Sequence, residues 1–536
     1  MWINKIKKHF KWIVAIGFSI LNIALSMRYV GYIMLDQDPW IALYGAKRIL
    51  EGQLLYKDFF DFVTPGTDYL LAGVFYIFGL KLTNAHLAVI LSNAAVTTIV
   101  IFISFDIIKN KWLSLLPGLL FALYSPYVYY VSHHWFILLP AIFVLSSGIK
   151  NIKEHTDKSD NWLFTGLATS GVFLFIQSIG LTLFGMIVLF IVWHYTVDKL
   201  KIKPFLQPLM YYILGFIIPL IFVVICFALS GSLSAFIYDS FIWPFSHYKI
   251  ANASAVPELF SMLIDELTNR GISPTIINGF IGYFGILLGI IVFVYLGLKY
   301  KRKKTSEMAF LFFTSALCVG LILGLIQNPA SNHIMVFLPV YIFVIILIFE
   351  FKPFWSTYFF KIGYYVYFLL ITVAIFYNAY KFYSIYNNAL KEPLIIKTPV
   401  GDVRIPKAFI NTGMYAPYGF LKEMGDKLPK YIFVLYWSPS IYVLTGTENP
   451  TMLNTYLPYY NTKEQAMAAI QALKANRTKL VIIDEGMNYI KLSFLHHNSV
   501  FDPRMVSSNE PLISYIHTHY RLEKTIPGYT IYRLVK

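Results

Sequence analysis

Charged residues are scarce in this sequence of 536 residues. Lys, Arg, Asp and Glu make up 13% of it, whereas they make up about 25% of an average soluble domain. Hydrophobic residues make up 57%, so too few polar groups remain to keep the surface of so long a chain hydrated. This excludes an ordinary soluble protein and indicates that lipid covers much of the chain.

The sequence also lacks the patterns of a disulfide framework, a nucleic-acid-binding surface and a nucleotide-binding loop. The 2 cysteines, Cys226 and Cys318, lie inside apolar runs and indicate no disulfide framework. The net charge of +16 comes from lysines in short loops between apolar runs, without a basic stripe interleaved with aromatic residues. Nucleic acid is therefore not an expected partner. The C-terminal part has no Gly-rich phosphate loop, which disfavours a nucleotide-binding domain there.

Long hydrophobic runs dominate what is present. A helix that crosses a bilayer needs about 20 apolar residues. The first run is too long for a signal peptide and has no small-residue cleavage site before Asp36, so we interpret it as a retained span. The runs predict about eleven spans, near residues 12–35, 85–107, 112–131, 134–150, 163–179, 180–196, 207–229, 277–298, 308–325, 334–350 and 363–380.

The distribution of Lys and Arg predicts the orientation of these spans. With the N-terminus in the cytoplasm, the lysine-rich connections fall on the cytoplasmic side, and the connections after spans three, five and nine carry no Lys or Arg. Counting the short apolar segment 66–80 as a span would reverse this pattern. We interpret it as an interfacial or re-entrant helix, or as an extension of span two. The sequence thus predicts a multi-pass membrane protein with a cytoplasmic N-terminus. Its abundance of Lys, Ile, Asn, Tyr and Phe suits an AT-rich bacterial genome, so the expected location is the bacterial inner (plasma) membrane.

The chain divides into two regions. Residues 1–380 form the predicted transmembrane domain, with a first outer loop at 36–84 and a long outer loop at 230–276. Residues 381–536 contain no spanning run and form a predicted extracytoplasmic α/β domain. The expected fold class is an α-helical polytopic membrane protein with a C-terminal α/β domain. In that domain we expect strands at 431–436, 479–484 and 529–535 and a helix at 462–475.

Acidic residues gather in the first outer loop. The spans are nearly free of charge, which disfavours an ion-coupled transporter. Asp36 and Asp38 follow span one, and Asp58 and Asp61 come about twenty residues later. A carboxylate there can act as a general base or can hold a divalent cation such as Mg²⁺ or Mn²⁺ against a phosphate. The alternative is that Asp36 and Asp38 only cap a short interfacial helix at 39–51.

A resemblance adds to this interpretation. The family pattern is an Asp-Glu pair, a helix of the form Ala-Arg-x-Ile-Leu-x-Gly, a Tyr-Arg-Asp-Phe-type stretch, a Pro-Gly or Pro-Pro pair and a segment ending in Phe-Gly. This sequence matches it with Ala46-Lys-Arg-Ile-Leu-Glu-Gly52, Tyr56-Lys-Asp-Phe59, Thr64-Pro-Gly66 and Phe78-Gly79. The loop resembles that of bacterial GT-C glycosyltransferases, which take a sugar from a polyprenyl-phosphate carrier. These include the aminoarabinose, rhizobial lipopolysaccharide and protein O-mannosyl transferases.

The resemblance implies a reaction and a site. The donor would be a polyprenyl-phosphate-linked sugar and the acceptor an envelope glycan, lipid or protein, with transfer by inversion on the outer face. Asp38 falls on the family's catalytic Asp, but Pro39 replaces the usual Glu neighbour. Asp36 is the candidate for the second carboxylate. No cofactor is otherwise implied, and Asp36 and Asp38 are the candidate ligands for any divalent cation.

Further outer-face residues are candidates for substrate binding. Each has an ordinary alternative: membrane anchoring for the His133–His134 pair, backbone hydrogen bonding for Gln177, interface chemistry for Lys249 and an ion pair with Asp36 or Asp38 for Arg28. The candidates are Arg28, Asp58, Asp61, His133, His134, Gln177, His247, Lys249 and His333.

Two other functions fit the same architecture. A lipid-linked sugar polymerase, ligase or flippase shares the span count but does not need the Asp38 pattern, and a flippase needs a polar central cavity. A non-catalytic scaffold for envelope assembly would tolerate replacement of Asp38.

Overall fold

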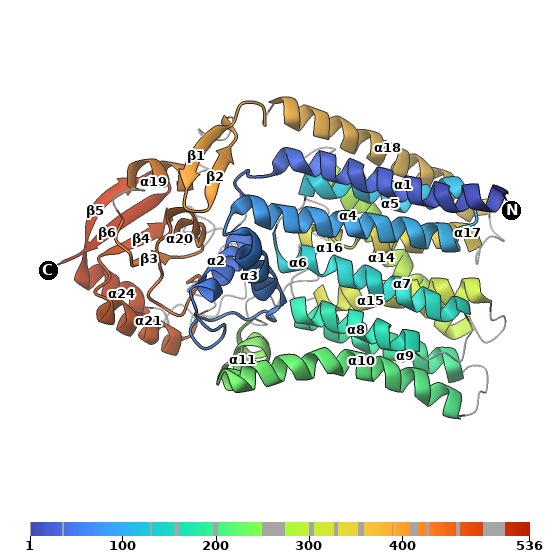
Figure 1. The fold of residues 1–536 in the computed structure, drawn as a ribbon, viewed down its shortest axis with the longest axis horizontal. Coiled ribbons are helices and arrows are strands. Elements are labelled where there is room, and N and C mark those ends of the chain that lie inside the picture. The colour runs from blue at the N-terminus through green and yellow to red at the C-terminus, as the bar shows by residue number, and fades with distance from the viewer. Residues whose placement is uncertain are drawn as a thin grey trace.

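The computed structural model places a long helical bundle beside a smaller C-terminal domain (Figure 1). It describes residues 2–34, 37–128, 131–154, 160–196, 202–248, 274–299, 305–325, 331–351, 358–388, 390–407, 416–424, 428–456, 461–485 and 510–535.

The long helices of the bundle lie roughly parallel, with the N-terminus at the end away from the C-terminal domain (Figure 1). They are α1 (Trp2–Ser26), α4 (Leu82–Ile107), α5 (Lys111–Val128), α7 (Leu138–Glu154), α8 (Asp160–Phe175), α9 (Gln177–Thr196), α10 (Ile202–Leu229), α14 (Pro274–Lys299), α15 (Ser306–Leu325), α17 (Leu338–Phe351) and α18 (Tyr358–Asn388). Each predicted span coincides with one of them. In the described part, 7 helices are long and apolar enough to cross a membrane, and shorter apolar helices accompany them.

Small residues allow some of these helices to approach closely. A Cβ on Gly166 of α8 would lie 2.1 Å from the carbonyl oxygen of Tyr212 on α10. A Cβ on Gly215 of α10 would lie 2.1 Å from the carbonyl oxygen of Leu163 on α8. Glycine at both positions lets the two backbones touch, which is a common way to pack helices where lipid removes the hydrophobic driving force.

Short elements fill the space between the bundle and the C-terminal domain. They are η1 (Met27–Tyr29), α2 (Asp38–Leu50), α3 (Gly66–Phe78), α6 (His133–Phe136), α11 (Leu233–Ile237), the π-helical turns η2 (Tyr238–Ile242) and η3 (Pro244–Tyr248), and α16 (Ser331–Met335). The segment predicted at 66–80 is thus a separate helix. Gly79, with φ of 89°, ends α3 before α4 begins, so the segment is not an extension of span two.

The C-terminal domain contains two sheets. A hairpin of β1 (Leu394–Thr398) and β2 (Gly401–Ile405) follows α18, which continues beyond the predicted end of its span. A four-stranded sheet has the order β3-β4-β6-β5, in which β3 (Ile432–Leu435) and β4 (Leu480–Asp484) are parallel and the other pairs are antiparallel. The remaining elements are α19 (Ala416–Met424), α20 (Ser440–Thr445), α21 (Lys463–Ala475), α24 (Glu510–His519), β5 (Tyr520–Ile526) and β6 (Tyr529–Leu534).

The expected elements of this domain are present. The apolar sequences of β3 and β4 are buried along their whole length, as expected of parallel strands that are covered on both faces. Thr462 caps α21, where its side chain accepts a hydrogen bond from the N–H of Gln465 and the Gln465 side chain bonds back. The fold class is therefore confirmed as helical and polytopic with a C-terminal α/β domain.

Candidate active site

A buried arginine joins the first outer loop to the C-terminal domain. Arg48, on α2, is 3% exposed. Its guanidinium donates to Asn454 Oδ1 at 3.0 Å and to the carbonyl oxygen of Thr451 at 3.1 Å, both in the C-terminal domain. It also donates to Gln53 Oε1 and to the carbonyl oxygen of Asp58 in its own loop. One side chain therefore fixes the C-terminal domain against α2.

Aromatic and backbone contacts extend this junction. The rings of Tyr44 on α2 and Tyr442 on α20 stack with centroids 4.7 Å apart. The N–H of Asn449 donates to the Tyr44 hydroxyl at 2.8 Å, and the N–H of Phe60 donates to the carbonyl oxygen of Met452 at 2.7 Å. The helix predicted at the membrane surface is consequently packed under the C-terminal domain.

A cavity of about 150 Å³ lies at this junction. The bundle, the first outer loop and the C-terminal domain all contribute to its wall. The lining residues are Asp38, Ile41, Ala42, Phe60, Asp61, Phe62, Val63, Thr64, Thr67, Asp68, His133, His134, Trp243, His333, Trp437, Asn454, Thr455 and Asn461. The structure thus brings together five of the predicted site residues: Asp38, Asp61, His133, His134 and His333.

Asp38 is the first residue of α2, and Pro39 stands beside it at the helix start. The N-cap residue is Gln37, which makes no side-chain capping hydrogen bond. A carboxylate in the first turn lies at the positive end of the helix dipole, which favours its ionised form. Position and electrostatics are both compatible with a base that faces the cavity.

Three carboxyl groups lie near this part of the loop, of which Asp68 and Asp239 are buried and Asp61 is half-buried. Burial raises the pKa of Asp61 to about 6, although the N–H groups of Phe62 and Val63 bond to the carboxylate and oppose the shift. Burial and the nearby charge of Asp61 raise the pKa of Asp68 well above its ordinary value. The same two causes raise the pKa of Asp239, on η2, to about 8. Protonated carboxyl groups can donate as well as accept hydrogen bonds, so the site has both capacities near neutral pH.

Asp68 approaches α2 closely. A Cβ on Gly45 would lie 2.1 Å from Asp68 Oδ1, so only glycine at position 45 leaves room for the carboxyl group. Among the described residues Asp68 Oδ1 has no hydrogen-bond partner, although the side chain is 4% exposed. A buried acceptor of this kind is costly unless something occupies the cavity beside it.

Other polar atoms of the cavity wall share this property. Within the described part of the chain, buried atoms of further lining residues lack a hydrogen-bond partner, among them Thr67 Oγ1, His134 Nδ1, Trp437 Nε1 and Asn454 Nδ2. Together with Asp68 Oδ1 they offer donors and acceptors from α3, α6 and the C-terminal domain. The wall is thus suited to a polar ligand with several hydroxyl groups.

Three histidines form one side of the cavity. The rings of His134 on α6 and His333 on α16 stack with centroids 3.7 Å apart, and His133 lies 4.3 Å from His134 by the same measure. The sequence separates His333 from the pair by about two hundred residues. Their meeting supports the site interpretation of all three positions over membrane anchoring.

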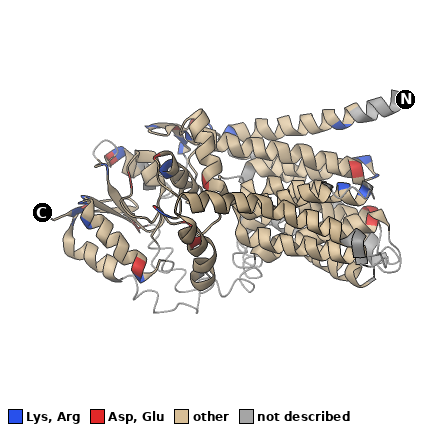
Figure 2. Cartoon of the chain, turned by 60° about the horizontal axis from the view of Figure 1, so that its bottom comes forward, with Lys and Arg blue, Asp and Glu red and all other residues tan. Residues whose placement is uncertain are grey.

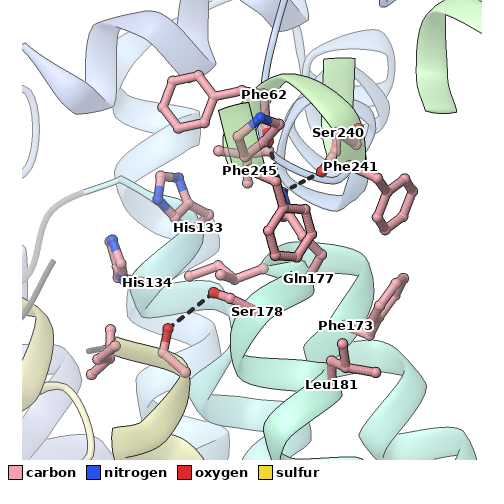
Figure 3. Close-up of a pocket in the computed structure, with 15 residues that line it drawn as sticks. Phe62, His133, His134, Phe173, Gln177, Ser178, Leu181, Ser240, Phe241 and Phe245 are labelled. Carbon is pink, nitrogen blue, oxygen red and sulfur yellow. Dashed lines mark hydrogen bonds between the residues drawn. The ribbon is translucent and has the colours of Figure 1, made fainter. Parts of the chain in front are cut away.

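A second, mostly apolar pocket of about 150 Å³ adjoins the first cavity; Figure 3 shows the residues that line it. Aromatic and aliphatic side chains of α8, α9 and the π-helical turns line it, among them Phe173, Leu181, Phe241 and Phe245. The two cavities share four lining residues: Phe62, Val63, His133 and His134. A single ligand with a polar head and an apolar tail matches this pair of cavities.

Gln177 also borders this pocket, but backbone groups use its amide. It donates to the carbonyl oxygens of Phe62 at 2.8 Å and Ser240 at 2.9 Å, and it accepts from the N–H of Thr64 (Figure 3). The alternative of backbone hydrogen bonding is therefore the better description. Gln177 holds the first outer loop, α9 and η2 together.

The remaining candidates lie elsewhere. Arg28 is exposed in η1, and Asp58 is exposed and accepts the N–H of Leu54; neither lines the two cavities. His247 stacks on Trp243 with centroids 5.3 Å apart, behind the cavity wall. Asp36 and Lys249 fall outside the described residues. Among the described residues that line the two cavities, none is Lys or Arg.

Sequence reasoning missed several lining residues. Asp68 carried a usable signal, because it is an acid in the first turn of an otherwise apolar helix after Pro65-Gly66. Trp437, Asn454 and Asn461 carried none, since they come from loops of a domain whose docking only the tertiary structure provides.

Of the two candidate ligands for a divalent cation, Asp38 is described and Asp36 is not. Among the described residues, no group of three or more His, Cys, Asp or Glu side chains is arranged to hold a metal ion.

Comparison with known proteins gives little at the sequence level. No family model and no curated protein matches the chain. Among solved structures, the fold is similar to the crystal structure of ArnT from Cupriavidus metallidurans bound to undecaprenyl phosphate. The two chains are 10% identical, 97% of each is covered and the TM-score is 0.43.

Proposed function

We propose that this chain is a membrane glycosyltransferase that moves a sugar from a polyprenyl-phosphate carrier to a glycan, lipid or protein acceptor. In this proposal the C-terminal domain faces the outside of a bacterial plasma membrane and closes over the reaction site.

One observation carries the proposal: a cavity that contains Asp38 and several other polar side chains shares its wall with a more apolar pocket at the end of the helical bundle. A polyprenyl-phosphate sugar has the matching shape, with a sugar for the polar cavity and isoprene units for the apolar one. The unpartnered polar atoms of Thr67, Trp437 and Asn454 suit sugar hydroxyl groups.

The proposed chemistry is a single displacement. The acceptor oxygen or nitrogen attacks the anomeric carbon, the bond from that carbon to the phosphate oxygen breaks, and the phosphate leaves with the electron pair. The acceptor proton passes to the carboxylate of Asp38. Attack opposite the leaving group inverts the anomeric carbon.

Stabilisation of the departing phosphate falls to neutral donors and histidines in this proposal. No Lys or Arg is present among the described lining residues, whereas His133, His134 and His333 stand together. Ring N–H groups can donate hydrogen bonds to phosphate oxygens in a site that excludes water. The proposed steps use only protein side chains, because among the described residues no group of three or more His, Cys, Asp or Glu side chains is arranged to hold a metal ion.

The test is transfer of radiolabelled sugar from a panel of polyprenyl-phosphate sugars to envelope lipids and glycans. Asp38→Asn should reduce transfer by roughly 10²- to 10⁴-fold, the usual contribution of a general base. Asp402→Asn is the matched control, because it removes one exposed carboxylate, on β2 and outside the cavity, and it should retain transfer.

Each outcome has a meaning. Loss in Asp38→Asn with a normal melting temperature supports the enzyme and names the donor. Full transfer by Asp38→Asn shows that the base assignment is wrong. A well-folded wild type that is inactive across the panel contradicts the glycosyltransferase, and translocation of lipid-linked sugar is then the measurement that separates a flippase from a scaffold.

A further inference from the structure

A third cavity, of about 750 Å³, lies at the end of the bundle away from the C-terminal domain. Residues from α1, α4, α5, α7 and α15 line it, near the N-terminus in Figure 1. Its wall has two parts. Aromatic and aliphatic side chains of α1, α4 and α15 form one part, and lysines and carboxylates form the other: Lys11, Asp106, Lys109, Lys111, Lys153 and Glu307.

The charges of this wall do not cancel. Lys11 Nζ lies 2.6 Å from Asp106 Oδ1, and Lys109 forms an ion pair with Glu307. Lys111 and Lys153 form no ion pair with any described residue. The lining residues therefore carry an excess of two positive charges. Glu350 lies nearby but outside the wall, where the N–H groups of Lys109 and Asn110 donate to its carboxylate.

Two tryptophans mark the depth of this cavity. Trp12 is next to Lys11 and is 49% exposed, and Trp112 is next to Lys111 and is 79% exposed. Exposed tryptophans at the ends of spanning helices lie at the level of the lipid headgroups. Figure 2 shows that charged residues gather at this end of the bundle and are rare along its length. The lysines of the cavity thus lie at headgroup level.

We propose that this cavity binds the phosphate headgroup of an anionic glycerophospholipid. Lys111 and Lys153 contact the phosphate, and the apolar part of the wall packs against the upper acyl chains. A basic pocket between spanning helices suits such a headgroup. A small soluble phosphate would leave the apolar wall without a partner, which is why the proposal is a lipid. The site lies at the opposite end from the proposed active site and does not depend on it.

The experiment is native mass spectrometry of the full chain in detergent with added dioleoylphosphatidylglycerol. The test variant is Lys111→Gln/Lys153→Gln, and the control is Lys81→Gln/Lys150→Gln. The control removes the same charge, and Lys150 lies three residues from Lys153 on α7 but outside the cavity wall. Each lysine near a headgroup contributes about 1 kcal/mol, so the test variant should bind phosphatidylglycerol roughly 10- to 30-fold more weakly. The control should bind as the wild type does.

A change of opposite sign separates binding from a structural effect. Glu307→Gln removes a carboxylate from the wall and releases Lys109, so it should tighten binding. Equal weakening in the test and control pairs would overturn the proposal. Equal binding of phosphatidylcholine would show that the headgroup charge is not recognised. Equal binding of glycerol 3-phosphate would show that the ligand is a soluble phosphate and not a lipid.

Discussion

The two ends of the helical bundle differ in how far their charged residues are buried. At the end beside the C-terminal domain, Lys47, Arg48, Asp68 and Asp239 are all buried. At the other end, the lysines and carboxylates of the large cavity are mostly exposed, with 75% of the Lys109 side chain accessible. The first end is covered by protein and the second is open to the membrane surface.

This difference in burial determines at which end the charged residues affect stability and protonation. Burying an ionisable group is costly unless hydrogen bonds satisfy it or its ionisation changes. At the junction both responses occur, because Arg48 donates four hydrogen bonds and the carboxyl groups take up protons more readily. At the other end most of the charged residues are exposed, so solvation offsets their cost. They are therefore available for the headgroup binding that we propose.

Replacement of Arg48 tests the comparison most severely. Arg48→Met should destabilise the junction by about 3–5 kcal/mol, because it leaves buried acceptors such as Asn454 Oδ1 and the Thr451 carbonyl unpaired. Lys109→Met is the control from the open end, and it should barely change the melting temperature. Thermal melting and limited proteolysis between the bundle and the C-terminal domain measure both variants. Equal effects would show that the two ends do not differ in this way.

The pH dependence of stability sharpens the comparison. A carboxyl group whose pKa is higher in the folded chain binds more protons there, so stability falls as pH rises from the unfolded pKa, near 4, to the folded value. For Asp239 that window extends to about pH 8. Asp239→Asn should therefore resemble the wild type at pH 4 and become progressively more stable than it as the pH rises to 8. Melting curves across this range test it, and a constant difference between the two proteins would contradict it.

The smallest expected effect concerns the part of the cavity wall that the C-terminal domain contributes. Trp437→Phe removes an N–H that has no described partner, so we expect transfer to fall about five- to tenfold with the effect mainly in the KM of the donor. Trp12→Phe, at the open end, is the control and should leave transfer unchanged. If both variants transfer sugar normally, Trp437 does not contact the substrate.

Much of the fold was predictable because a helix that spans a bilayer needs a long run of apolar residues. Every predicted span coincides with a helix, and the strands at β3, β4 and β6 and the capped helix α21 were expected from apolar runs and the Thr462 cap. The hairpin β1–β2 and the small helices of the C-terminal domain were not predicted. Their patterns are short, and their burial depends on contacts with the bundle, such as the N–H of Leu82 with the carbonyl oxygen of Val400.

The candidate site was predictable only in part. Local motifs pointed to Asp38, Asp61 and the His133–His134 pair, which all line the cavity. They gave no means to tell that Arg28 and Asp58 lie outside it, because the same residue types occur at both kinds of position.

The sequence by itself determined that the chain is polytopic, where its helices run and that acids gather after the first span, because hydrophobic length and charge are local properties. Only the tertiary structure decided which of these groups share a cavity. His333 stacks on His134, and Trp437 and Asn454 line the same cavity as Asp38, across hundreds of residues. Such meetings depend on helix packing and on the docking of the C-terminal domain through Arg48, which are set by the sum of many distant contacts.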